Sequence, residues 1–137
     1  SCTNSSYEDV SRAASLADAA MKAGLKAKVP YLISPGSETI FLTMKRDGQL
    51  ATFDAIGGTV LSNSCGPCIG QWKREDVKGG VKNAIVTSFN RNWQNRMGLG
   101  GEGYLASPAV VAASALVGYM APPGELGLQW DAEAFGV

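Results

Sequence analysis

Three cysteines are the residues best suited to chemistry in this 137-residue chain. Cys65 and Cys68 stand in the stretch CGPC, whose spacing lets two thiolates converge on one metal centre. Alone, the pair also fits a redox couple, half of a zinc site or two small buried residues. Cys2 supplies a third sulfur, and the chain contains no histidine, the usual nitrogen ligand of zinc.

Three thiolates favour one kind of metal site. Structural zinc sites are closed by four protein ligands, and electron-transfer iron-sulfur clusters normally use four cysteines. A cubane cluster held by three thiolates leaves one iron open, and an open iron can bind substrate oxygens as a Lewis acid. We therefore expect a substrate-binding iron-sulfur cluster. An electron-transfer or iron-storage module and a structural zinc or packing role remain alternatives.

Two arginines in the stretch SFNRNWQNR form a second candidate group. On a continuous helix Arg91 and Arg96 would point about 140° apart, whereas on a loop that leaves a strand both can face one cavity. Guanidinium groups grip carboxylates through paired, charge-assisted hydrogen bonds, so these arginines predict a pocket for a di- or tricarboxylic acid. Asn90 and Asn92 can hydrogen-bond cluster sulfur or substrate, and asparagine is also an ordinary turn residue.

Helix and strand signals alternate along the chain. Apolar residues from Val10 to Met21 recur at helical spacing, with Ser5 and Glu8 as a capping box and Gly24 as a stop. Strands are predicted at 29–33, 59–62 and 83–89, and further helices from Ser37 to about residue 46, around 49–58, and after Ser107 and Pro108. We expect residues 1–120 to form one domain and 121–137 to be a linker or edge segment.

This alternation predicts an α/β fold, a three-layer αβα sandwich with a mainly parallel sheet. Ligands of such folds bind where loops leave the carboxyl ends of the strands. The loops SPGS, NSCGPCIG and NRNWQNR follow the three predicted strands, so they should open on one edge. SCTN has the same appearance, although its strand would have to precede residue 1. We therefore expect Cys2 to face the other loops and the chain to be cut at a strand-to-loop junction.

Charge and hydropathy argue against two classes of partner. Twelve basic and twelve acidic side chains cancel, and no run of like charge reaches five, so neither nucleic acid nor a membrane surface is an expected partner. No apolar stretch approaches the ~20 residues that span a bilayer. An odd number of cysteines without a secretory signal indicates a reducing compartment.

The chain resembles the aconitate hydratase family, specifically its third, cluster-holding domain. The resemblance lies in SCTNSSYEDVSRAA, PGSE, RDGQ, CGPCIGQWKREDVKGG and TSFNRNWQNR, and it covers roughly residues 1–96. It implies that Cys2, Cys65 and Cys68 ligate a [4Fe-4S] cluster, that Asn90 contacts this cluster without ligating it, and that Arg91 and Arg96 bind substrate carboxylates.

The resemblance also implies a reaction, the interconversion of citrate and isocitrate through cis-aconitate. The catalytic base and further substrate-binding groups are then expected from other domains, so this chain alone should be an inactive part of the enzyme. A mitochondrial location follows from the family, with a cytoplasmic one as the alternative. After Arg96 the stretch MGLGGEGYLASPAVVAA is more similar to isopropylmalate dehydratase or a homoaconitase, which leaves those substrates as alternatives.

Overall fold

The computed structural model describes residues 5–62, 82–89, 93–98 and 100–127. Its elements alternate between helices and short strands, which confirms the predicted α/β class. In chain order they are α1 (Tyr7–Lys22), β1 (Tyr31–Ile33), α2 (Glu38–Arg46), α3 (Gln49–Ala55), β2 (Gly58–Val60), β3 (Asn83–Thr87), β4 (Gly101–Leu105), α4 (Pro108–Val117) and the 3-10 helix η2 (Pro123–Leu126). None of the helices in these ranges is long and apolar enough to cross a bilayer.

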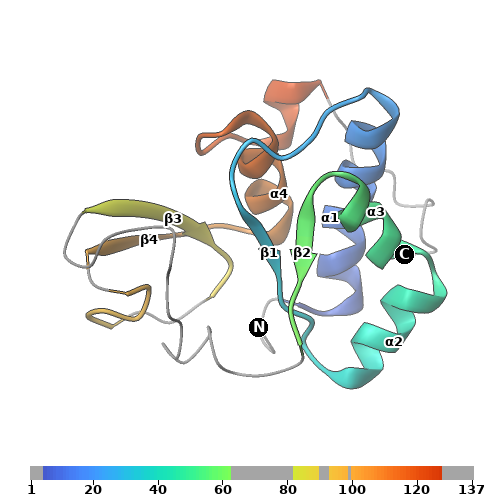
Figure 1. Ribbon diagram of the computed structural model, residues 1–137, viewed down its shortest axis with the longest axis horizontal. Helices are drawn as coiled ribbons and strands as arrows, with labels where there is room; N and C mark the ends of the chain where they lie inside the picture. The colour runs from blue at the N-terminus through green and yellow to red at the C-terminus, as the bar shows by residue number, and fades with distance from the viewer. Residues whose placement is uncertain (1–4, 63–81, 90–92, 99, 128–137) are drawn as a thin grey trace.

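The strands pair in parallel, as predicted, but they do not form one continuous sheet. Among the described residues, β1 pairs only with β2 and β3 only with β4. Figure 1 shows the β3–β4 pair at the left of the view, apart from the β1–β2 pair near the centre. The expected single sheet is therefore split in two, and a cavity lies between β1 and β3.

Helix α1 begins one residue later than the sequence predicts. Ser6, not Ser5, is its N-cap: the Asp9 N–H donates to Ser6 Oγ over 3.2 Å, and the Ser6 N–H donates to Asp9 Oδ2 over 3.3 Å. Ser5 is engaged elsewhere, since its hydroxyl donates to the Ser34 carbonyl. The capping box is thus Ser6 with Asp9, and α1 starts against the loop after β1.

One hydrophobic core joins the four α-helices and the first strand. Small side chains on α1 let it pack closely against α4, and the Phe53 ring meets the Tyr31 ring edge-on, with centroids 6.1 Å apart. The buried residues of this core are Val10, Ala13, Ala14, Ala17, Ala20, Tyr31, Ile33, Met44, Phe53, Ile56, Ala112, Ala115 and Leu116. This core fixes β1, and with it the start of the loop after β1.

Two elements depart from the predictions. Strand β4 was not expected, because two of its five residues are glycines and its side chains show no apolar alternation. The predicted linker or edge segment begins with the buried residue Ala121, whose N–H donates to Ser114 Oγ over 3.0 Å, and continues into η2. The division into a domain at 1–120 and a terminal segment stays a prediction.

Candidate functional site

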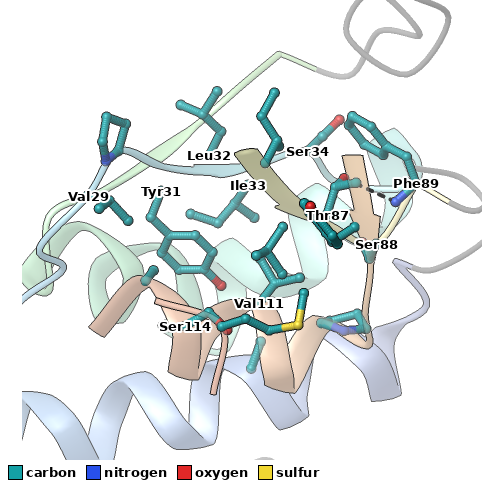
Figure 2. A pocket seen from close by; sticks show the side chains of 18 of the residues that line it. Val29, Tyr31, Leu32, Ile33, Ser34, Thr87, Ser88, Phe89, Val111 and Ser114 are labelled. Atoms are coloured by element: carbon teal, nitrogen blue, oxygen red, sulfur yellow. Dashed lines mark hydrogen bonds between the residues drawn. The ribbon is translucent and has the colours of Figure 1, made fainter. Parts of the chain in front are cut away.

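A cavity of about 790 Å³ lies between β1 and β3, over α4 and the start of α1 (Figure 2). Its lining includes Ser34 after β1, Leu61 after β2, Ser88 after β3 and Ser5 before α1. The described beginnings of the three post-strand loops, and the residue that leads into α1, therefore border one space. This is the edge at which ligands of parallel α/β folds bind.

Most of the predicted site residues lie outside the described ranges. These are Cys2, Cys65, Cys68, Asn90 and Arg91, and their roles stay predictions. Within the described residues, no group of three or more His, Cys, Asp or Glu side chains could hold a metal ion. Only Arg96, of the predicted site residues, is placed by the structure.

The sequence predicts Arg96 on a loop after β3, and the structure places it on a turn there and not on a helix. It is not among the residues that line the cavity, so the prediction that it faces this space is not met. Its N–H donates to the Trp93 carbonyl over 3.1 Å, and its side chain is only 2% exposed. The guanidinium carbon lies 4.6 Å from the centre of the Trp93 ring and 5.3 Å from that of Phe89. Both contacts are cation–π interactions, which orient a planar guanidinium and restrict its motion.

The backbone holds this turn tightly against the start of β4. Asn95 has a left-handed conformation with φ of 64°, and the Gly98 N–H donates to its carbonyl over 3.1 Å. A Cβ atom on Gly101 would stand 2.6 Å from the Met97 carbonyl oxygen, so only glycine lets β4 pass this close. Met97 is itself buried, and the backbone beside Arg96 is thereby fixed.

The two serines of the loop after β1 have structural partners. Ser5 Oγ donates to the Ser34 carbonyl over 3.1 Å, which ties the start of α1 to this loop. Ser37 caps α2, because its hydroxyl accepts from the Ile40 N–H over 3.2 Å. The hydrogen bonds at Ser34 and Ser37 are thus those of a loop tie and a helix cap.

A polar cluster that joins the first turn of α1 to the end of α2 was missed by sequence reasoning. The Tyr7 hydroxyl donates to Asp47 Oδ2 over 2.5 Å, and Arg46 donates to both Asp47 oxygens over 2.8 and 3.0 Å. The Arg46 hydrogen bonds, followed by that of Tyr7, lower the pKa of Asp47 to about 2. Burial, followed by the bond to Asp47, raises the pKa of Tyr7. None of the three is among the residues that line the cavity.

The Phe89 and Trp93 contacts with Arg96 were also missed. The signal in the sequence is an aromatic residue on each side of the Asn-Arg-Asn triplet in SFNRNW. It is weak, because two aromatics four residues apart on a loop do not show which cation they will contact.

Comparison with known proteins shows to which family the chain is related. The family model described as aconitase (aconitate hydratase) matches residues 1–118. The chain belongs to the aconitase family. Its match extends beyond the motifs that carried the resemblance and includes β3, β4, the Arg96 turn and α4.

Similar proteins include three mitochondrial enzymes. The chain is 52% identical over 120 residues to a probable mitochondrial aconitate hydratase of Dictyostelium discoideum, covering 86% of the chain and 16% of that protein. It is 53% identical over 127 residues to mitochondrial aconitate hydratase of Candida albicans, covering 93% of the chain and 16% of that protein. It is 53% identical over 120 residues to mitochondrial aconitate hydratase of Saccharomyces cerevisiae, covering 86% of the chain and 15% of that protein. The chain thus spans about one sixth of the length of these relatives.

Proposed function

We propose that this chain is the cluster-holding part of a mitochondrial aconitate hydratase that interconverts citrate and isocitrate. The observation that carries the proposal is the chemistry of the donor set. The chain offers three thiols and no histidine, on segments that adjoin described residues around one cavity. The family match and the names of the similar proteins support the same reaction.

The three cysteines fit an iron-sulfur cluster better than a closed zinc site. Zinc in a structural site takes four protein ligands, and a set of three thiols without histidine does not complete such a site. Cys2, Cys65 and Cys68 would hold the cluster. When bound, a [4Fe-4S] cluster with three thiolate ligands supplies one Lewis-acidic iron that lacks a protein ligand.

Arg91 and Arg96 bind and orient the carboxylates of the substrate in this proposal. A guanidinium presents two parallel N–H donors to a carboxylate, which sets both the position and the plane of the bound group. Arg96 is suited to this task because Trp93 and Phe89 hold its guanidinium between them. Asn90 adds a hydrogen-bonding amide next to the cluster.

The remaining catalytic groups come from the rest of a longer enzyme. Dehydration of citrate requires a base that removes a proton beside a carboxylate. From the resemblance to the aconitase family, we assign this base and further substrate contacts to other domains of the longer enzyme. The isolated chain is expected to bind the cluster without turning over substrate.

A second candidate substrate class rests only on the resemblance noted from the sequence of the stretch MGLGGEGYLASPAVVAA, which includes β4, to isopropylmalate dehydratase or a homoaconitase. Assays of the full-length enzyme with citrate, isocitrate, isopropylmalate and homocitrate separate these possibilities. We expect turnover of citrate and isocitrate. If the enzyme turned over only isopropylmalate or only homocitrate, that compound would be its substrate and the proposed citrate reaction would be wrong.

Substitution of the thiols tests the proposed cluster. In the full-length enzyme, Cys2→Ser, Cys65→Ser and Cys68→Ser should each abolish activity and remove iron and acid-labile sulfide together, because each removes one of three ligands. Ser62→Ala, at an exposed position three residues before Cys65 in the sequence, is the matched control and should retain both. Full cluster content in any one of the cysteine variants would contradict the ligand assignment.

A further inference from the structure

The stretch RDGQ, residues 46–49, joins α2 to α3 and makes polar contacts with α1. Tyr7 and Ser11 lie one turn apart on α1 and therefore on the same side of this helix. The Tyr7 hydroxyl donates to Asp47 Oδ2 over 2.5 Å, and Gln49 Nε2 donates to Ser11 Oγ over 2.9 Å. Figure 1 shows α2 and α3 beside α1. The RDGQ stretch is thus bonded to α1 at two successive turns.

These contacts form a continuous series of hydrogen bonds from the surface to the core. The side chain of Arg46 is 73% exposed and that of Asp47 is 25% exposed, whereas Ser11 and Gln49 are buried. Burial and the bond to Asp47 raise the pKa of Tyr7, and a hydrogen bond with Ser11 acts in the opposite direction, as a bond donated to the phenol oxygen does. The donors therefore point outward from Gln49 to the Asp47 carboxylate.

Hydrogen bonds at this contact fix the position of α1 more closely than apolar packing alone. Hydrophobic contact has no preferred direction, whereas a hydrogen bond weakens steeply as its angle departs from linearity. A bond to a carboxylate is also stronger than one between neutral groups. Arg46 donates to both Asp47 oxygens, over 2.8 and 3.0 Å, so Tyr7 meets an acceptor that is itself oriented.

A second attachment holds the start of α1 to a different element. Ser5 Oγ donates over 3.1 Å to the Ser34 carbonyl in the loop after β1, a residue 29 positions away in the sequence. Tyr7 reaches Asp47, which is 40 positions away. Two of three consecutive residues are therefore bonded to distant parts of the fold, and together they restrict both the position and the rotation of the first turn of α1.

The first turn of α1 limits where Cys2 can reach. Cys2 precedes Ser5 by three residues, and three extended peptide units span at most roughly 10 Å. A shift of this turn is therefore passed on to the Cys2 thiol. Ligand distances in a metal site vary by only about 0.2 Å, so a cluster is sensitive to the placement of each of its thiolates.

We propose that Tyr7 and Asp47 are positioning residues for the cluster: their hydrogen bond fixes the first turn of α1 and, through it, the place of the Cys2 thiol. This inference rests on the proposed function, in which Cys2 is a ligand. Weakening of the bond should loosen the cluster while the hydrophobic core keeps the chain folded. The RDGQ stretch thereby acts on a ligand from a distant part of the sequence.

Amide hydrogen exchange in the cluster-free, full-length enzyme tests the anchoring of α1 by itself. Tyr7→Phe removes the hydroxyl donor and keeps the ring. The amides of Asp9 and Val10, which donate to the Ser6 hydroxyl and carbonyl, should exchange about 10-fold faster in this variant. Glu8→Gln, at an exposed position in the same turn, is the matched control and should change these rates little. Equal rates in the two variants would overturn the proposal.

Release of cluster iron tests the link to Cys2. In the reconstituted full-length enzyme, Tyr7→Phe and Asp47→Ala should each release iron to a chelator about 10-fold faster than the parent. The double variant should be no faster than the faster single variant, because both substitutions remove the same bond. Asp47→Asn keeps an uncharged acceptor and should be intermediate. Release at the parent rate, or effects that add in the double variant, would contradict the shared positioning role.

A core variant separates positioning from general loss of stability. Phe53→Ala removes a buried ring far along the chain from Cys2 and should lower the unfolding temperature more than Tyr7→Phe, yet release iron more slowly. Release rates that simply follow the unfolding temperatures would overturn the proposal.

Failure of this proposal can be told apart from failure of the proposed function. A parent enzyme that takes up no iron and sulfide on reconstitution would contradict the proposed function. A parent enzyme with a full cluster, and Tyr7→Phe and Asp47→Ala variants that retain it equally well, would contradict only the role of these two residues.

Discussion

The helical core and the β3–β4 sheet are held by different means. Among the described residues, the core cluster draws on α1, α2, α3, α4 and β1, and none of its members comes from β3 or β4. Beside β4, the large buried side chain is the charged Arg96, stacked between two aromatic rings. The difference teaches that apolar packing holds the first region, whereas a buried cation in contact with aromatic rings supports the second.

The largest expected effect is on the core. Phe53→Ala should lower the free energy of unfolding of the chain by about 3–5 kcal/mol, because it leaves a cavity beneath Tyr31 where a 1% exposed ring now packs. Chemical denaturation measures this loss. Leu42→Ala, at a 54% exposed position on α2, is the control and should change stability little. Comparable losses in both variants would contradict the assignment of the core.

A substitution of Arg96, beside the β3–β4 sheet, should change the activity of the enzyme more than its stability. In the full-length enzyme, Arg96→Lys should lower kcat/KM for citrate by about 100-fold, because lysine keeps the charge but loses the paired donors and the stacking plane. The unfolding temperature should change far less than in Phe53→Ala. Unaltered kcat/KM would show that Arg96 serves packing alone.

A glycine of β4 tests whether the backbone positions Arg96. Gly101→Ala should raise KM for citrate by about 10-fold, because the new methyl group would meet the Met97 carbonyl oxygen at 2.6 Å and displace the turn. Gly103→Ala is the matched control, since its nearest contact would be an ordinary 3.5 Å to Met97 Cγ. Equal KM values for citrate in the two variants would contradict a role of this turn in substrate binding.

The smallest expected effect concerns the Tyr7–Asp47–Arg46 cluster. The pKa of Asp47 is lowered to about 2 in the folded chain, so its ionised form stabilises the fold above the usual carboxyl pKa, and this contribution is lost as pH falls toward 2. Asp47→Asn should therefore be slightly less stable than the parent chain near neutral pH, and the difference should vanish in acid. Thermal unfolding of both at several pH values measures it; a difference that grows in acid would contradict the assignment.

Local sequence signals predicted the helices well. The apolar series of α1 and the Ser107-Pro108 start of α4 are visible in the chain, because capping and helical periodicity act over a few residues. The cap of α1 was misplaced by one residue, since Ser5 and Ser6 are both good caps and only the distant Ser34 carbonyl decides between them. Such local signals cannot predict contacts between residues that are far apart in the sequence.

The sheet and the site were predicted less completely for the same reason. Strand β4 carries little signal of its own, because two of its five residues are glycines and the close approach to Met97, not strand propensity, accounts for Gly101. The stacking of Arg96 between Phe89 and Trp93 depends on a turn whose shape is set by Asn95 and Gly98. The split into two sheets depends on a cavity that no local pattern reveals.

The central claim is that three thiols of this chain hold a cluster whose one remaining iron meets the substrate. Mössbauer spectra of the full-length enzyme, reconstituted with iron-57 and recorded with and without citrate, test it most directly. We expect one of about four iron sites to differ from the others and to shift alone when citrate binds. Four sites that stay unchanged in the presence of citrate would contradict it.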